Sequence, residues 1–138
     1  QVHGVDVADL PGAGDAGDTA IVADACVTTA TGVACTVMVA DCLPVLLANT
    51  VGTVVAAAHA GWRGLAGEAG QGVLESVYQR FSALAHAGCA QNAINTVAWL
   101  GPCIGPDAFE AGDSVKAAFV QTDPDAPALH RARAPGEQ

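Results

Sequence analysis

An almost uninterrupted run of apolar residues at positions 51–59 constrains the fold of this chain more than any other feature. Within it, residues 54–58 are Val-Val-Ala-Ala-Ala, so neither face offers a polar side chain to solvent. A strand with this composition is typically covered on both faces. We therefore predict that residues 51–59 form a central strand of a sheet and that this strand ends at His59.

The remaining strands are predicted from short β-branched runs separated by turn residues. Three of these runs are residues 19–29, 33–40 and 44–48, and a fourth is residues 93–100. Only 14% of the residues are charged, against roughly 25% in an average domain, which is too few to give every strand a solvated face. Much of the backbone is therefore expected to be buried on both sides.

Two helices are predicted after the central strand. Between residues 65 and 87, apolar side chains recur every three or four positions, which is typical of one long amphipathic helix. His86 falls in its last turn, where the helix dipole favours a cation. A second helix is predicted to begin near Asp113, which would be its N-cap. Residues 5–19 are predicted to form a loop, and residues 121–138 a weakly ordered tail.

Length, charge and cysteine content narrow the class of protein. The 138 residues fit a single domain over residues 1–138, and because the chain opens at Gln1 without a Met, we expect this domain to lack both of its ends. The net charge of −9 repels phosphate backbones and anionic lipid headgroups, so neither nucleic acid nor a membrane is an expected partner. Five cysteines without framework spacing indicate reduced thiols and a cytoplasmic protein.

A thiol and an imidazole fall at the ends of two predicted strands. If the strands that end at Cys42 and His59 meet at one edge of the sheet, both side chains face one cleft. Thiolate and imidazole are the ligands that zinc prefers, and three protein ligands with one open position make a catalytic site. His3 is the best third ligand, although His86 and His130 are also available. The alternative is that the cysteine is a small buried hydrophobe and the histidine a hydrogen-bonded structural residue.

The segment after His59 predicts an anion site. A strand that passes through Gly61 and Gly64 into a helix leaves unpaired backbone N–H groups at the helix start. Arg63 brings a fixed positive charge to the same place, in a chain with only five basic residues. The alternative is a structural arginine that pairs with a neighbouring carboxylate.

Further candidates are a loop thiol and three carboxylates. Cys103 lies in the Gly- and Pro-rich loop 101–106 and is a candidate nucleophile or ligand. Asp24, Asp41 and Glu110 are candidate partners for a ligating histidine. The alternatives are an unreactive thiol and ordinary carboxylates at strand ends or in solvent.

Five motifs follow one another in a fixed order along residues 1–120. They are residues 1–4 (Gln-Val-His-Gly), 23–28 (Ala-Asp-Ala-Cys-Val-Thr), 40–47 (Ala-Asp-Cys-Leu-Pro-Val-Leu-Leu), 57–64 (Ala-Ala-His-Ala-Gly-Trp-Arg-Gly) and 99–106 (Trp-Leu-Gly-Pro-Cys-Ile-Gly-Pro). Together they resemble the YfiH family, also called the laccase-domain or polyphenol oxidase family. The resemblance implies an α+β fold of four layers, α/β/β/α with mixed β-sheets, related in shape to the cysteine-hydrolase toxins of the cytotoxic necrotizing factor type.

The resemblance also implies a metal and an activity. The family's zinc ligands map to His3, Cys42 and His59, of which Cys42 and His59 are also our candidate catalytic residues. The family is credited with phosphorolysis of the purine nucleosides adenosine, inosine and methylthioadenosine, and with adenosine deamination. A nucleoside and phosphate are therefore the expected partners, and we expect a monomer or a small homo-oligomer.

Catalytic roles follow from this chemistry. A zinc ion lowers the pKa of bound water toward neutrality, and a neighbouring carboxylate would move protons during deamination. Asp41 is the first candidate for that carboxylate and Glu110 the second. Arg63, with the backbone at Gly61 and Gly64, is predicted to position the phosphate in phosphorolysis.

Three alternatives come from other classes of function. A copper polyphenol oxidase is one, since a cysteine and two histidines resemble a copper ligand set. Four histidines, however, cannot supply a trinuclear copper cluster and a separate electron-entry site. A second is a metal-free hydrolase acting on a peptidoglycan precursor, with Cys42 as nucleophile and His59 as base. The third is a binding module without catalytic activity.

Overall fold

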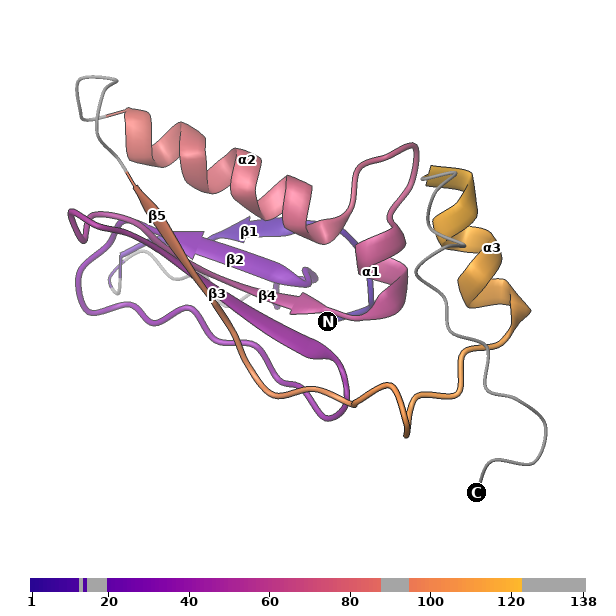
Figure 1. Cartoon of the computed structure of the whole chain (residues 1–138). Helices are drawn as coiled ribbons and strands as arrows, with labels where there is room; N and C mark the ends of the chain where they lie inside the picture. The colour runs from indigo at the N-terminus through magenta and orange to yellow at the C-terminus, as the bar shows by residue number, and fades with distance from the viewer. Residues whose placement is uncertain (13, 15–19, 88–94, 123–138) are drawn as a thin grey trace.

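One mixed five-stranded sheet organises the protein, whose computed structural model describes residues 1–12, 14, 20–87 and 95–122 (Figure 1). Its strands are β1 (Val7–Asp9), β2 (Ala25–Thr28), β3 (Leu43–Asn49), β4 (Val55–Ala60) and β5 (Thr96–Leu100), in the order β1-β2-β4-β3-β5. Strand β1 runs parallel to β2, and all other neighbours are antiparallel. The apolar run at 51–59 thus supplies the central strand, as predicted, with β2 and β3 on its two sides.

Three helices accompany the sheet in the described part of the chain: α1 (Trp62–Ala66), α2 (Val73–His86) and α3 (Asp113–Thr122). Helix α2 lies along one face of the sheet, and α1 and α3 lie beside each other past the end of β4 (Figure 1). The predicted helix near Asp113 is confirmed, but Asp113 is its first residue and not its N-cap, since Gly112 O accepts the first helical hydrogen bond. No helix within the described ranges is long and apolar enough to cross a membrane.

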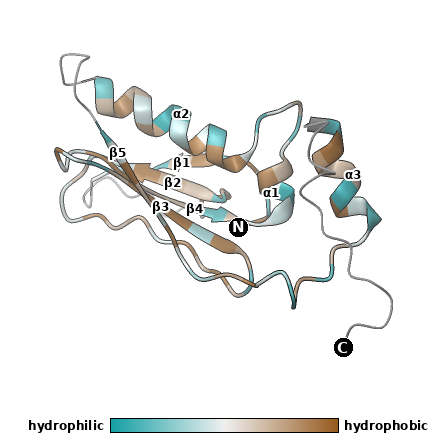
Figure 2. Cartoon of the chain, in the orientation of Figure 1, coloured by the Kyte–Doolittle hydropathy of each residue, from teal (hydrophilic) through white to brown (hydrophobic). Residues whose placement is uncertain are grey.

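The core lies between α2 and the sheet. Figure 2 shows apolar colour along most of the strands and a mixture of apolar and polar colour along α2. Helix α2 buries Val73, Val77, Phe81 and Ala85. Apart from Leu47, the sheet residues in the same cluster are alanines and β-branched valines, and include Ala25, Val27, Val45, Ala56, Ala58 and Ala60. Alanines on β4 keep this face flat, so the larger helix side chains fill the core.

The opposite face of the sheet is also apolar but is only partly covered. Because side chains alternate along a strand, Leu46 and its β5 neighbour Trp99 point away from α2. They are 41% and 53% exposed, and Val97 on the same face is 56% exposed. The expectation that the sheet is buried on both sides therefore holds for β4 but not for β5.

The predicted strand at 33–40 is wrong. This segment forms no ladder; it crosses the sheet face opposite α2, where Cys26 Sγ contacts Thr36 O at 3.9 Å. Both edges of β4 are already paired with β2 and β3, so an extended segment in this position has no free edge to join. The amide side chain of Gln1 instead holds it, accepting from Met38 N at 2.9 Å and donating to Met38 O at 3.1 Å.

Two other predictions need correction at the start of the chain. The composition predicts a loop over residues 5–19, but strand β1 lies within this range. Three residues are too few to show an alternating pattern, so this strand cannot be recognised from the sequence. The strand predicted at 19–29 is shorter and spans only Ala25–Thr28. Strand β5, predicted at 93–100, begins at Thr96 in the described part of the chain. Apart from its first two residues, the tail predicted at 121–138 lies outside the described residues.

The single helix predicted over residues 65–87 is wrong, because the chain forms α1 and α2 with a turn at residues 67–72 between them. The turn begins at Gly67, whose φ of 61° and ψ of −160° only glycine adopts readily. A Cβ there would overlap the carbonyl group of Gln71. The Glu75 carboxylate then caps α2 by accepting from Gly72 N at 3.0 Å.

Replacing Gly67 with alanine is expected to lower the free energy of unfolding by about 3 kcal/mol, because backbone strain and overlap with Gln71 add together. The matched control is Gly70→Ala, at a φ of 81° with open space around the new Cβ, where strain alone costs about 1 kcal/mol. Urea unfolding midpoints of the two variants measure the difference. Equal destabilisation of the two variants would contradict this prediction, because it would mean that backbone movements remove the overlap between the new Cβ and Gln71.

Candidate metal centre

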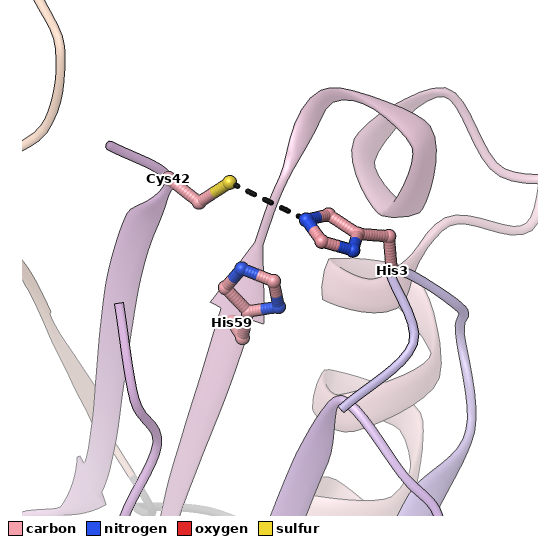
Figure 3. Close-up of side chains that lie close together, drawn as sticks. All are labelled: His3, Cys42 and His59. Atoms are coloured by element: carbon pink, nitrogen blue, oxygen red, sulfur yellow. Dashed lines mark hydrogen bonds between the residues drawn. The ribbon is translucent and has the colours of Figure 1, made fainter. Parts of the chain in front are cut away.

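Three side chains from distant parts of the sequence converge at the end of the central strands. His3 precedes β1, Cys42 immediately precedes β3, and His59 lies near the end of β4; the three point toward one another (Figure 3). Leu43 is in register with Ala60, which brings Cys42 and His59 to the same edge of the sheet. The two side chains do share one edge, but not for the predicted reason: the strand expected to end at Cys42 is absent, and Cys42 reaches this edge because it immediately precedes β3.

The cluster has the dimensions of a metal site. Its ligand atoms all lie within 4.8 Å of one another, and Cys42 Sγ is 3.9 Å from His3 Nε2. A tetrahedral zinc with bonds of about 2.0–2.3 Å would hold its ligand atoms roughly 3.5 Å apart. Small side-chain movements would therefore close the cluster on an ion. Thiolate and imidazole also suit copper, so the donor set by itself does not select the metal.

The cluster is open on one side. His59 is only 5% exposed, Cys42 is half-buried, and His3 is exposed. The two imidazole rings meet edge to face, with centroids 4.8 Å apart and an angle of 72° between their planes. A metal ion here would have three protein ligands and an open position toward solvent, which is the arrangement of catalytic rather than structural zinc sites.

A buried carboxylate lies behind the two histidines. Asp24, which precedes β2, is 1% exposed and lies 2.8 Å from His59 Nδ1. It also accepts hydrogen bonds from the backbone N–H groups of Val2, His3 and Gly4, at 2.9, 2.9 and 2.8 Å. Burial raises the pKa of Asp24, but the hydrogen bonds from His59 and these N–H groups outweigh it and lower the pKa to about 2.

Asp24 therefore carries a full negative charge at neutral pH beside the cluster. Sequence reasoning ranks it no higher than Asp41 and Glu110, yet those two are exposed. The signal that distinguishes Asp24 is its place inside the buried stretch at residues 24–28. A charged residue in such a stretch is expected to be paired.

The charges around Cys42 favour a cation. Burial raises the pKa of the Cys42 thiol, and the negative charges of Asp41 and Asp24 raise it further. A nucleophilic cysteine needs the opposite, a lowered pKa. A divalent cation among these groups would offset both carboxylates and hold the sulfur as thiolate. The electrostatics thus suit a metal ligand better than a free nucleophile.

Two of the predicted phosphate-binding residues are the glycines Gly61 and Gly64. Gly61 packs against two side chains of the cluster, and Gly64 packs against the backbone next to His3. A Cβ on Gly61 would lie 2.8 Å from His3 Cδ2 and 3.1 Å from Cys42 Sγ. A Cβ on Gly64 would lie 2.9 Å from the carbonyl oxygen of Gly4. Both glycines are buried, and a side chain at either position would clash with these neighbours.

The third of these residues, Arg63, is exposed on α1. Its guanidinium carbon lies 4.4 Å from the centroid of the Trp62 ring, a cation–π distance. Among the described residues, no carboxylate lies within ion-pair distance of Arg63; the two pairs found there are His59–Asp24 and Arg80–Asp9. The alternative of a structural arginine paired with a carboxylate therefore finds no support in this part of the chain.

A pocket of about 300 Å³ adjoins Cys42. It is lined mainly by apolar side chains, with Asp41 as a charged group at its wall; the lining includes Leu43, Trp62, Leu65, Cys103, Ile104, Pro106 and Phe109. The loop thiol Cys103 is thus part of the pocket wall. A flat apolar group held there would lie directly beside Cys42.

The remaining candidate residues lie elsewhere. His86 Nδ1 is 2.6 Å from the carbonyl oxygen of Ser82 in the last turn of α2, and takes no part in the cluster. His130, the other alternative ligand, lies outside the described residues.

Known proteins identify the family. A family model described as multi-copper polyphenol oxidoreductase laccase matches residues 1–138. The chain belongs to this family, the YfiH family. The purine nucleoside phosphorylase YfiH of Escherichia coli (strain K12) is 50% identical over 123 residues, which are 89% of this chain and 44% of the relative. Adenosine deaminase RL5, from an unknown prokaryotic organism, is 38% identical over 98 residues, or 70% of this chain and 33% of the relative.

The fold agrees with that of a solved YfiH-family structure. Protein NMB0706 of Neisseria meningitidis superimposes with a TM-score of 0.73 at 38% sequence identity, covering 98% of this chain and 50% of that one. The chain thus spans about half the length of the relatives that it matches.

Proposed function

We propose that this chain forms the metal-binding part of a zinc-dependent purine nucleoside phosphorylase that acts on adenosine, inosine and methylthioadenosine. The observation that carries the proposal is the convergence of His3, Cys42 and His59 beside an apolar pocket. The relative named purine nucleoside phosphorylase YfiH supports the reaction. The relative named adenosine deaminase RL5 supports adenosine deamination as a second activity.

Zinc would be held by His3, Cys42 and His59. Bound there, it would act as a Lewis acid and lower the pKa of a coordinated water toward neutrality. We propose zinc rather than copper because the described residues supply one three-ligand cluster with an open position, which is a zinc arrangement. Elemental analysis of the purified protein tests this choice, and about one copper per chain would overturn it.

The pocket beside Cys42 would hold the purine ring. Its apolar walls, which include Trp62 and Phe109, suit a flat aromatic base. Asp41 lines the same pocket and is exposed, so its carboxylate can exchange protons with solvent. We assign Asp41 the movement of protons to and from the purine, with Glu110 as the second candidate.

Arg63 would hold the phosphate in phosphorolysis. Its guanidinium is exposed, stacked on Trp62 and free of carboxylate partners in the described region. A guanidinium binds phosphate oxygens in a bidentate manner. The backbone at Gly61 and Gly64 is predicted to assist as a source of N–H groups.

The Arg63→Ala variant is expected to lose phosphorolysis by roughly 10- to 100-fold, the worth of one charge-assisted contact, while adenosine deamination continues. Base release and deamination, assayed with and without phosphate, separate the two activities. The matched control is Arg80→Ala, whose guanidinium pairs with Asp9 away from the cluster. Unchanged phosphate dependence in Arg63→Ala would refute this role.

The alternatives from the same residues are distinguishable. A Cys42/His59 hydrolase acting on a peptidoglycan precursor needs a reactive thiolate, and the raised pKa of Cys42 weighs against it. Such an enzyme would survive chelation and be inactivated by iodoacetamide. A binding module would show no nucleoside turnover at all. A cytoplasmic location and a monomer or small homo-oligomer are predictions that go with the main proposal.

We also propose that this sheet is one of two in the four-layer α/β/β/α fold. The exposed apolar side chains of Leu46, Val97 and Trp99, on the face opposite α2, suit a second layer of sheet. The relatives have about as much chain again as the part matched here, which is enough to supply it.

A further inference from the structure

One carboxylate holds both histidines of the cluster. Asp24 Oδ1 accepts from His3 N at 2.9 Å and lies 2.8 Å from His59 Nδ1. Asp24 Oδ2 accepts from Val2 N at 2.9 Å and from Gly4 N at 2.8 Å. Three backbone N–H groups and one imidazole nitrogen, from two distant segments, thus share one buried side chain.

We propose that Asp24 is the positioning residue that fixes both imidazole ligands at once, an inference that rests on the proposed metal site. It acts on His59 by selecting the tautomer and on His3 by holding the backbone turn at residues 2–4. No contact with substrate or metal is required of Asp24 for this role.

The effect on His59 follows from proton placement. An ionised carboxylate only accepts hydrogen bonds, so His59 must carry its proton on Nδ1 to pair with Asp24. The Nε2 lone pair is then left for the metal, which is the arrangement that ligating histidines require. The backbone N–H groups of Val2, His3 and Gly4 can only donate, so together they hold both Asp24 oxygens as acceptors.

The effect on His3 follows from backbone strain. His3 has a φ of 60°, in the left-handed region that residues other than glycine rarely adopt. Consecutive N–H groups that point at one anion form a nest, and the anion offsets the strain. Without the negative charge, the N–H groups of residues 2–4 lose their shared acceptor, and the turn that presents the His3 ring relaxes.

An amide cannot replace this carboxylate. If the side-chain NH₂ group introduced by Asp24→Asn took the place of Oδ2, it would oppose the N–H donors of both Val2 and Gly4. If the NH₂ group instead took the place of Oδ1, it would face one backbone donor, His3 N, and it would donate a hydrogen bond to His59 Nδ1. The second arrangement leaves fewer opposed donors, and it forces the His59 proton onto Nε2, where it blocks metal binding.

The test compares wild type, Asp24→Asn and the surface control Asp9→Asn. Long-range ¹H–¹⁵N spectra of the metal-free proteins at a pH where imidazole is neutral report the His59 tautomer. We expect the Nδ1–H form in wild type and Asp9→Asn, and the Nε2–H form in Asp24→Asn. Zinc affinity, measured by competition with a chromogenic chelator, is expected to fall about 10- to 100-fold in Asp24→Asn only.

The outcomes separate this inference from the proposed function. An Asp24→Asn protein with wild-type zinc affinity overturns the inference, whatever its tautomer. If that variant does not fold, the wild-type spectrum alone decides, because a His59 protonated on Nε2 in metal-free wild type also overturns it. A wild-type protein that binds no zinc refutes the proposed function, while the tautomer comparison still tests what Asp24 does.

Discussion

Replacing Cys42 with alanine is expected to abolish stoichiometric zinc binding and to lower kcat/KM for phosphorolysis by about 10³-fold or more. The thiolate is the one anionic ligand of the cluster, and its loss leaves two neutral imidazoles, of which His3 is exposed. A catalytic metal supplies several kcal/mol of transition-state stabilisation, and each 1.4 kcal/mol or so is a factor of ten. Metal analysis and a phosphate-dependent nucleoside assay on the same sample measure both effects.

Two controls define what this result means. Cys103→Ala removes an exposed thiol from the wall of the same pocket without touching the cluster, and is expected to keep the wild-type zinc stoichiometry. Chelation of the wild type should reproduce the Cys42→Ala defect, and added zinc should reverse it in the wild type only. Phosphorolysis that survives in metal-free Cys42→Ala would show that the cluster is not the catalytic centre.

Replacing Gly61 with alanine is expected to weaken zinc binding by about 10²-fold, with a matching loss of phosphorolysis, although no ligand is removed. The new Cβ would lie 2.8 Å from His3 Cδ2 and 3.1 Å from Cys42 Sγ, so two ligands must move to make room. A displacement of about 1 Å at a reacting centre costs on the order of 10²-fold in rate, and zinc binding is expected to weaken because the same two side chains would hold the ion. Zinc competition titrations and steady-state kinetics measure the two losses.

The matched control for Gly61→Ala is Gly105→Ala. Gly105 lies in the loop after β5 near the pocket, and a Cβ there meets nothing within 4 Å. Wild-type zinc affinity is expected for this control. If Gly61→Ala binds zinc with wild-type affinity, the prediction is wrong, because His3 and Cys42 can then move away from the new Cβ without losing the ion.

The central part of the fold was predictable from local sequence. The apolar run before His59 predicts β4 as the central strand, and the structure confirms it. This inference needs only the alternation of side chains and the length of the run. The shared edge of Cys42 and His59 is found although the strand predicted at 33–40 is absent, because β3 begins directly after Cys42 and pairs with β4. The resemblance of five short motifs to the YfiH family indicates His3 as the third ligand, which spacing alone leaves open, and the structure places His3 beside Cys42 and His59.

Other features depend on contacts that local sequence does not encode. The apolar repeat continues through α1 and α2, so it does not reveal the break between them. The break arises at Gly67, whose backbone packs closely against that of Gln71. Strand β1 is three residues long and exists because β2 offers it an edge. The four donors of Asp24 come from positions 2–4 and 59, so its role emerges only when the sheet has brought them together.

The strand order has a consequence for the lifetime of the protein. Cys42 and His3 are 39 positions apart in sequence, and His59 and Asp24 are 35 apart, so the cluster forms only after β4 has paired with both β2 and β3. An ion that binds the assembled cluster and not the open chain adds about 4 kcal/mol to folding when its free concentration is roughly a thousand times its Kd. Metal supply would then govern how long the chain escapes proteolysis.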